Sequence, residues 1–199
     1  MREEQAQVGV DLQQFCAHEE IRPDLHKPFR YKGYVYATDG RIAVRVADNP
    51  SYETGKIAID KALKFDEPRT FVKAPRVKLP PMAKPKTVPC IDCDGRGKEH
   101  DCPDCGCECY TCKGTGSLIK RPEVSTRFAG QLFHVEYVRM LYSLPDLEYA
   151  PNPPSMDGGG LLFEPMYFRF AGGMGVVMPL SREYPKHVDL EAEQQPGEH

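Results

Sequence analysis

The stretches CIDCDGRG (residues 90–97) and CYTCKGTG (residues 109–116) both fit the pattern CxxCxGxG without a mismatch. Two residues between cysteines let one tight turn present both sulfurs to a single metal ion. Glycine allows the positive φ angles that fold the backbone back beneath the metal. Two such turns facing each other supply the four ligands of a tetrahedral zinc ion. We therefore predict a zinc site formed by Cys90, Cys93, Cys109 and Cys112.

The predicted zinc ion has a structural role. Four thiolates fill a tetrahedral site and leave no position for water or a substrate. The metal should instead supply much of the folding free energy of this short, glycine-rich segment. Seven of the eight cysteines lie between Cys90 and Cys112. In a reducing compartment such clustering favours metal–thiolate bonds over disulfides.

Four further candidate ligands lie between the two motifs, within eight residues of the chain. This spacing is cramped for a tetrahedral site and leaves two alternatives open. Either these residues bind a second zinc ion, or the module holds one zinc ion and they serve as alternative ligands or stay uncoordinated. The four residues are His100, Cys102, Cys105 and Cys107.

An α+β domain is predicted on both sides of this module. Before it, an amphipathic helix spans Asp11 to about Glu20, with Asp11 as its N-cap. Strand patterns follow at Phe29–Tyr31, Tyr34–Thr38 and Ile42–Val46. Asp39-Gly40 between the last two predicts a hairpin with positive φ at both turn positions. Weaker strand patterns lie at Lys56–Ile59 and Thr70–Lys73.

The part after the module repeats this order of elements. Thr126–Phe133 has a strand pattern, and Val135–Leu144 has a helical one that Pro145 ends. Further strands are predicted at Leu161–Phe163, Met166–Phe170 and Gly175–Leu180. Residues 38–46 and 171–179 each read as a glycine turn followed by an apolar strand, which indicates a faint internal repeat.

These patterns divide the chain into five segments. The first half of the domain covers residues 5–76 and the second half covers residues 119–182. A stiff, proline-rich linker at 77–87 leads into the zinc module at 88–118. The polar, acidic tail at 183–199 is expected to be disordered.

The cysteine motifs resemble the cysteine-rich region of DnaJ-type co-chaperones, which has four CxxCxGxG repeats and binds two zinc ions. Here the outer repeats are intact and the inner pair is compressed to CPDCGC (residues 102–107). The chain lacks the His-Pro-Asp signature of a J-domain, so the resemblance covers the zinc module alone.

The flanking halves resemble bacterial DNA polymerase III beta subunits, the sliding clamps. YVYATDGRIAVRV (residues 34–46) is similar to their ATDG(H)RLA signature, and IRPDL (21–25) to the T-R-P-V-L stretch after the first helix. FHVEYVRML (133–141) is similar to their F-x-x-x-Y-L-x-x-x-L helix, and GVVMPL (175–180) to their closing strand. The resemblance implies one DNA-clamp-like domain of two β-α-β-β-β motifs, with both helices on one side and the zinc module inserted between its halves. A full clamp subunit has three such domains, so a ring would require a homo-oligomer of this chain.

A basic stretch precedes the zinc module. The net charge is -3, yet residues 56–86 hold nine Lys or Arg against three acids. Such a stretch can contact nucleic-acid phosphates or can be a solvated face. The helix faces are neutral or acidic, which disfavours encircling DNA. The candidate nucleic-acid-binding residues are Lys73, Arg76, Lys78, Lys84 and Lys86.

The sequence has no nucleophile–base pair, phosphate-binding loop or HExxH motif, so we expect no enzyme. It lacks an apolar run of the ~20 residues that span a bilayer, and residues 1–15 are polar, without the apolar region that a signal peptide would have. We expect a cytoplasmic, zinc-stabilised, clamp-like binding protein of DNA replication or processing, acting through DNA or protein contacts. Two alternatives stay open: a small phage or mobile-element factor that binds a host complex, and a chaperone-like, peptide-binding zinc module.

Overall fold

The computed structural model describes residues 9–17, 22–55, 59, 63–81, 84–98, 106–120, 123–151, 164–181 and 186–192. The chain forms two compact units. The larger unit consists of Met1–Pro80 and Val124–His199, and the smaller unit of Pro81–Glu123. The smaller unit therefore contains the predicted zinc module, inserted between two halves of the larger unit.

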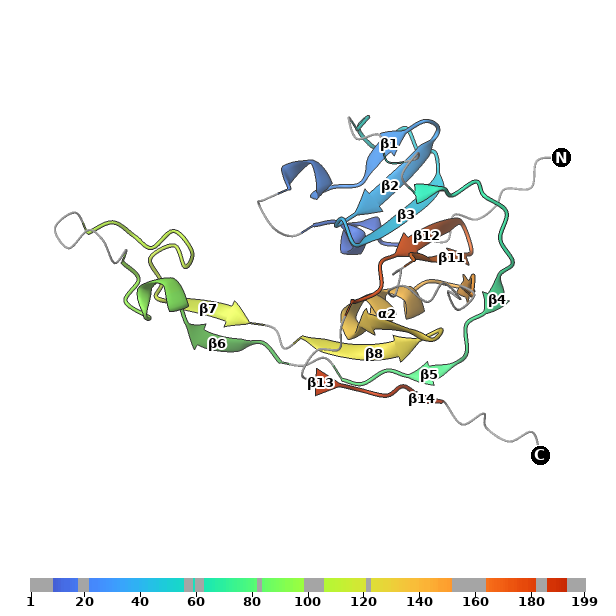
Figure 1. Cartoon of the computed structure of the whole chain (residues 1–199). Helices are drawn as coiled ribbons and strands as arrows, with labels where there is room; N and C mark the ends of the chain where they lie inside the picture. Colours follow the sequence, from blue (N-terminus) through green and yellow to red (C-terminus); the bar gives the residue numbers. More distant parts are fainter. Residues whose placement is uncertain are drawn as a thin grey trace. The chain divides into compact units, whose positions relative to one another are not determined.

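A seven-stranded antiparallel sheet with the order β1-β2-β3-β12-β11-β10-β4 forms the centre of the larger unit (Figure 1). Its strands are β1 (Phe29–Tyr31), β2 (Tyr34–Thr38), β3 (Ile42–Ala47), β4 (Val72–Lys73), β10 (Glu148–Tyr149), β11 (Met166–Phe170) and β12 (Gly173–Val177). The strands predicted at 29–31, 34–38, 42–46 and 166–170 are confirmed. The last predicted strand is shifted, since β12 begins and ends earlier than Gly175–Leu180. The strand patterns at Lys56–Ile59 and Leu161–Phe163 fall wholly or largely outside the described residues.

Six of the seven strands are arranged symmetrically about the pairing of β3 with β12, and β4 extends the sheet beyond β10 on one side. Each side of this pairing is a three-stranded meander, β1-β2-β3 or β10-β11-β12. Val44 lies opposite Gly175 at the centre. A Cβ at Gly175 would lie 2.2 Å from a ring atom of Phe168, so this cross-strand packing requires glycine. The two segments that the sequence pattern related, 38–46 and 171–179, are therefore neighbours in the sheet.

The first helical element is shorter than predicted. It is a 3₁₀ helix, η1 (Leu12–Phe15), and residues 18–20 of the predicted helix lie outside the described residues. Asp11 does cap it, because Asp11 Oδ1 accepts a hydrogen bond of 3.0 Å from the Gln13 amide. The chain turns extended at Cys16, with φ -89° and ψ 156°. A second 3₁₀ helix, η2 (Pro23–Leu25), follows.

The second predicted helix is confirmed as α2 (Val135–Tyr142), and its buried residues are Val135, Val138 and Leu141. The single strand predicted at Thr126–Phe133 is wrong: the structure has β8 (Val124–Phe128) and β9 (Gln131–His134), joined as a hairpin. Both turn residues have positive φ, 51° at Ala129 and 81° at Gly130. This is the two-residue turn that a right-twisted hairpin favours.

The turn at Asp39-Gly40 differs from the prediction, because only Gly40 has positive φ, 92°. Asp39 takes part through its side chain instead: Oδ1 accepts hydrogen bonds from the amides of Arg41 (2.7 Å) and Ile42 (2.9 Å). A carboxylate that bonds the following backbone is a common alternative to a turn with two left-handed residues.

The acidic tail is not disordered throughout. Residues 186–192 contain β13 (Lys186–His187), parallel to β8, and β14 (Glu191–Ala192). β14 pairs with β5 (Val77–Lys78), which lies at the start of the segment predicted to be a linker. Backbone hydrogen bonding to these partners orders the segments despite their polar composition.

Apolar side chains cover both faces of the large sheet. One face packs against η1, α2 and the β8–β9 hairpin, with Phe15, Val44, Phe133, Leu141 and Phe168 in its core. The other face packs against the side chains of Ile59, Leu63 and Phe71, with Tyr36, Phe65 and Tyr167 in its core. The fold is thus α+β and mostly antiparallel. Within the described residues, no helix has the length and apolarity needed to cross a membrane.

Candidate metal centre

Two short paired strands of the smaller unit lie before and after the two cysteine motifs in the chain. β6 (Lys86–Pro89) pairs with β7 (Ser117–Lys120), which brings Pro89 opposite Ser117. Cys90 follows β6 directly, and η3 (Ile91–Cys93) carries the chain to the second cysteine. The hairpin therefore places the start of the first CxxCxGxG motif beside the end of the second.

The two motifs form the same hydrogen bonds at equivalent positions. The Cys90 amide donates to the Gly116 carbonyl (2.9 Å), and the Cys109 amide donates to the Gly97 carbonyl (2.9 Å). The residues after Cys93 and Cys112 both have positive φ, 49° at Asp94 and 50° at Lys113. The motifs thus fold as two equivalent turns, which we call knuckles. The first residue of each knuckle is hydrogen-bonded to the last residue of the other.

The last glycine of each motif cannot be replaced without moving the other knuckle. A Cβ at Gly97 would lie 2.3 Å from the Gly114 carbonyl oxygen, and one at Gly116 would lie 2.2 Å from that of Gly95. Both glycines also have positive φ, 75° and 71°. The pattern CxxCxGxG therefore encodes the close backbone contact as well as the sulfur spacing.

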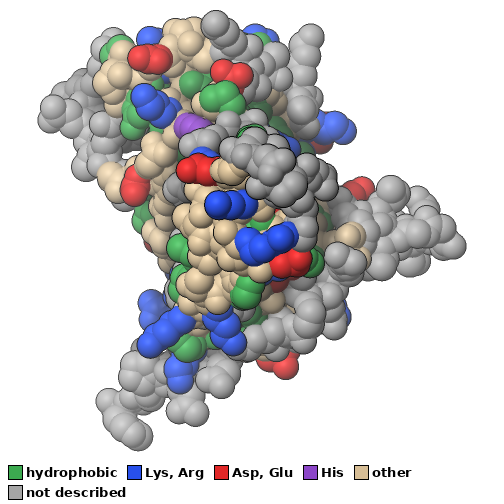
Figure 2. Space-filling model, turned by 90° about the vertical axis from the view of Figure 1, so that its left-hand side faces the viewer, with side chains coloured by type: hydrophobic (Ala, Val, Ile, Leu, Met, Phe, Trp, Pro, Cys, Tyr) green, Lys and Arg blue, Asp and Glu red, His purple; other side chains and the backbone are tan. Residues whose placement is uncertain are grey.

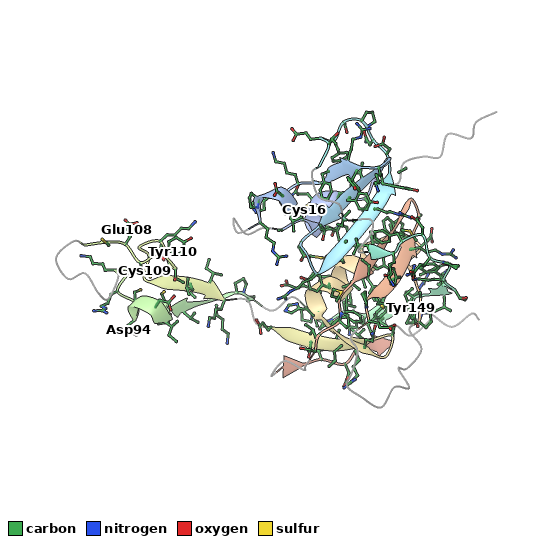
Figure 3. All side chains as sticks on the ribbon, turned by 45° about the horizontal axis from the view of Figure 1, so that its top comes forward. Cys16, Asp94, Glu108, Cys109, Tyr110 and Tyr149 are labelled. Atoms are coloured by element: carbon green, nitrogen blue, oxygen red, sulfur yellow. The ribbon has the colours of Figure 1, made fainter. Side chains whose placement is uncertain are left out.

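The four sulfur atoms form one buried group. Cys90, Cys93, Cys109 and Cys112 have their Sγ atoms within 4.8 Å of one another, and each residue is at most 5% exposed. Sγ of Cys90 lies 3.9 Å from that of Cys109, and Sγ of Cys93 lies 3.7 Å from that of Cys112. Figure 3 labels Cys109 in this unit, beside the exposed Tyr110.

These separations fit a shared metal ion. A tetrahedron of zinc–sulfur bonds of about 2.3 Å has edges of about 3.8 Å. A disulfide would instead need sulfurs about 2.05 Å apart. The group is therefore compatible with a metal held by four thiolates, and with no fifth ligand required.

The surroundings favour thiolate once a cation is bound. The Gly97 amide donates to Cys93 Sγ (3.3 Å), and the Gly116 amide donates to Cys112 Sγ (3.2 Å). Burial raises the pKa of the Cys90 thiol to about 12, and its sulfur neighbours Cys93 and Cys109 act in the same direction. A divalent cation reverses this preference, because coordination deprotonates a thiol outright. The amide donors then stabilise the sulfur charge.

The other predicted ligands do not join this group within the described residues. His100, Cys102 and Cys105 lie outside them. Cys107 is described, is exposed, and is not among the four clustered sulfurs. The choice between one and two metal ions thus depends on residues beyond the described part of the module.

The five basic candidates divide between the two units. Lys73, Arg76 and Lys78 belong to the larger unit, and Lys84 and Lys86 to the smaller. All five are exposed. On the face that Figure 2 shows, the coloured Lys and Arg side chains occur in separate groups with acidic side chains among them. The described structure therefore gives five accessible cations without assigning them to one surface.

Sequence reasoning missed the exposed apolar side chains of the smaller unit. Ile91 is 81% exposed, Tyr110 is 89% exposed, and Ile119 is 76% exposed. Ile91 and Tyr110 occupy the same position in the two motifs, directly after the first cysteine. The residues that follow them are joined, because Thr111 Oγ1 donates to Asp92 Oδ2 (2.6 Å). The CxxC spacing could have indicated this exposure. When both sulfurs of the turn point toward a shared centre, the side chain directly after the first cysteine points to solvent.

Cys16 is the one cysteine outside the predicted module. It is 2% exposed within the core of the larger unit (Figure 3). Burial raises the pKa of its thiol to about 11. It therefore stays protonated and acts as a small apolar residue.

Comparison of the chain with protein-family models, with curated proteins and with solved structures gives no match. The assignment of the candidate site therefore depends on the sulfur geometry and on the knuckles that produce it.

Proposed function

We propose that Cys90, Cys93, Cys109 and Cys112 hold a structural zinc ion in a non-enzymatic binding protein of DNA replication or processing. The observation that carries this proposal is the buried group of four sulfurs, with separations of 3.7 and 3.9 Å. Zinc is the metal that four-thiolate, CxxC-spaced tetrahedral sites select in proteins. Such a site is closed, so its contribution is to the fold and not to a reaction.

A clamp-like scaffold is the proposed frame for this module. The sequence resemblance to sliding clamps is one support. The pairing of two similar meanders through β3 and β12 is a second, because each half runs from a helical element into three consecutive antiparallel strands, to which β4 is added on one side. The packing of η1 and α2 against the same sheet face is a third. A scaffold does not dictate its task, so the contacts are proposed separately.

DNA contact is proposed through Lys73, Arg76, Lys78, Lys84 and Lys86. A protein that neutralises Z phosphates loses affinity with a log–log salt slope of about -0.9Z on duplex DNA. Replacing all five residues by Ala should therefore reduce the slope by about 4 to 5. Replacing Lys27 and Lys98, which are exposed and outside the set, is the matched control.

The test combines metal counting with DNA binding. Native mass spectrometry of protein purified with zinc reports the metal count and the number of subunits together. Fluorescence anisotropy with a labelled duplex, from low to physiological salt, then reports affinity and slope. Zinc in every folded chain supports the site, and salt-dependent affinity lost in the fivefold variant supports the DNA contact. Folded, reduced protein without any zinc would overturn the metal assignment.

A second candidate function is favoured by the exposed pair Ile91 and Tyr110. Large apolar side chains held in the open at adjacent turns are typical of a protein contact. A protein-interaction factor, such as one of phage or mobile-element origin, would bind its partner with little salt dependence. Replacing both residues by Ser should abolish that binding and leave the zinc content unchanged. Suppression of aggregation that depends on the same pair would instead indicate the chaperone-like alternative.

A further inference from the structure

A cavity of about 500 Å³ lies in the larger unit, beside the segment that leads from β4 through β5. One wall is this segment, residues 73–79, and the other is the connection from α2 to β10. Leu144 and Leu147 form its floor and are buried, 5% and 7% exposed. Pro75, Val77 and Leu79 add further apolar surface.

The walls are fixed by contacts of the folded unit. β4 pairs with β10, with Val72 opposite Tyr149, which Figure 3 labels. The Ala74 amide continues this pairing with a hydrogen bond of 3.0 Å to the Leu147 carbonyl. From α2, the Tyr142 hydroxyl donates to the Pro75 carbonyl (2.7 Å), and Arg139 donates to that of Pro80. The cavity is therefore preformed, which lowers the entropy cost of filling it.

The rim of the cavity is mainly cationic. Lys73 and Arg76 line it and are exposed, and Asp146 is its one acidic lining residue. Among the described residues, neither the Lys73 ammonium nor the Arg76 guanidinium has an ion pair or a hydrogen bond. A lining that combines apolar side chains with exposed cations at the edge is complementary to a ligand that is apolar in one part and anionic in another.

The chain itself shows how an acidic strand binds this segment. Its tail reads Asp189-Leu190-Glu191, and Glu191 lies opposite Lys78 in the β14–β5 pairing. Leu190 is half-buried against the main core. The backbone of an extended stretch with an acidic sequence therefore already pairs with β5, and its apolar residue Leu190 packs against the core.

We propose that this cavity is a docking site for an extended acidic segment of a partner protein. A large apolar side chain of that segment fills the space over Leu144 and Leu147, and flanking carboxylates lie near Lys73 and Arg76. A nucleic-acid backbone would use the two cations but would gain nothing from the apolar walls, so a peptide fits the cavity better. The inference rests on the proposed role as a binding protein and needs neither the metal nor DNA affinity.

The experiment uses the full-length, zinc-loaded chain and three labelled octapeptides in fluorescence anisotropy. The first carries Leu-Phe between two pairs of acidic residues, the second has Ser-Ser in place of Leu-Phe, and the third has Lys in place of the acids. We expect the first to bind, and the Ser-Ser peptide to bind ten- to a hundredfold more weakly, about the value of one buried apolar side chain. The Lys peptide should not bind.

Protein variants identify the site. The double variant Lys73→Ala/Arg76→Ala should weaken the first peptide about five- to tenfold, since exposed ion pairs contribute modestly. Ala74→Phe should block the cavity and abolish binding. Lys27→Ala is the matched control for loss of a surface charge, and circular dichroism with zinc content checks that every variant folds.

Several results would overturn the inference. They are equal binding of the Leu-Phe and Ser-Ser peptides, binding unaffected by the double variant, and no binding of the first peptide. Competition by a DNA oligonucleotide with no dependence on Leu-Phe would assign the two cations to nucleic acid instead. Peptide binding by a protein without DNA affinity would reject only the DNA contact, so failure of either proposal can be recognised separately.

Discussion

The two units of this chain are held together in different ways. The larger unit buries apolar side chains on both faces of a sheet, with Val44, Leu141 and Phe168 fully enclosed. In the described part of the smaller unit, the buried cluster consists of the four cysteines, with Leu118 packed against them. A unit this small cannot bury enough apolar surface to offset its loss of chain entropy. The comparison supports the proposal that a metal ion held by these cysteines takes the place of a core there.

Both units nevertheless use a pairing of two similar halves. In the smaller unit the paired knuckles are 19 residues apart in the chain. In the larger unit the central pairing joins β3 to β12, with Arg45 and Met174 separated by 129 residues. Closing the longer loop costs more chain entropy, and many apolar contacts repay it. The short loop costs less to close, so the proposed metal ion alone would be enough to hold the two knuckles together.

Removal of the metal is the change with the largest expected effect on this comparison. A chelator should unfold the smaller unit and leave the larger one folded, because apparent binding energies of structural zinc are on the order of 10 kcal/mol. Amide NMR spectra should lose the dispersed signals of residues 84–98 and 106–120 and keep those of the β3–β12 pairing. Cys93→Ser should have the same effect without a chelator.

Cys107→Ser is the matched control for this change, because Cys107 lies in the same unit and outside the sulfur group. It should retain the metal that the four clustered cysteines hold. A smaller unit that stays folded in excess chelator would contradict the idea that the metal replaces a core.

Loss of a core side chain in the larger unit should destabilise that unit and leave the smaller unit unaffected, the reverse of metal removal. Phe168→Ala should lower the free energy of unfolding by about 3–5 kcal/mol, as for other buried Phe residues. The zinc content should not change, since the smaller unit has its own stabilisation. Urea unfolding followed by circular dichroism, with metal analysis, measures both. Ile119→Ala is the control, because this exposed residue should contribute less than about 0.5 kcal/mol. Loss of zinc in Phe168→Ala would show that the units are not independent.

The knuckle glycines allow a finer test within the smaller unit. Gly116→Ala places a Cβ against the Gly95 carbonyl at positive φ. Gly106→Ala has the same kind of φ, 62°, but nothing lies within 4 Å of its Cβ. The second variant should therefore suffer only left-handed strain, about 1–2 kcal/mol, whereas the first should also separate the knuckles. Competition with a chromophoric chelator should show a markedly weaker zinc affinity for Gly116→Ala; equal affinities would mean that the knuckles do not need close contact.

The features that sequence predicted well are those fixed by local chemistry. The spacing of the cysteines was enough to predict that Cys90, Cys93, Cys109 and Cys112 form one group, because two short turns determine where the sulfurs point. Strands β2 and β3 follow from their apolar pattern, and α2 from its periodicity and Pro145. The clamp-like assignment stays a prediction, since no comparison tests it.

The features that sequence missed depend on contacts made at a distance. The helix after Asp11 stops at Phe15 because tertiary packing of Leu12 and Phe15 overrides helical periodicity. The split of 126–133 into two strands depends on a turn in which the non-glycine Ala129 adopts positive φ. The order in 186–192 arises from backbone pairing with β5 and β8, which an acidic composition does not reveal.

The smallest predicted effect concerns a single hydrogen bond that joins the two halves of the larger unit. The Tyr137 hydroxyl, on α2, donates to Asp39 Oδ2 (2.8 Å) in the β2–β3 turn. Burial, and then the Asp39 carboxylate, raise the pKa of Tyr137 above its usual value, against a smaller opposing effect of Arg41. Tyr137→Phe should cost about 1 kcal/mol at neutral pH, the net value of one such bond.

The pH dependence of the same variant gives the sharper readout. Because the folded pKa of Tyr137 lies above the unfolded value of about 10, the neutral phenol contributes stability that is fully present below pH 10. That stability is lost as the pH rises above it, when the unfolded chain releases the proton more readily than the folded one. Urea unfolding between pH 8 and 11 should therefore show a steeper loss of stability in the wild type than in Tyr137→Phe. Parallel pH profiles would mean that neither burial nor the Asp39 carboxylate raises the pKa of Tyr137, and that its hydroxyl does not stabilise the contact between α2 and the β2–β3 turn.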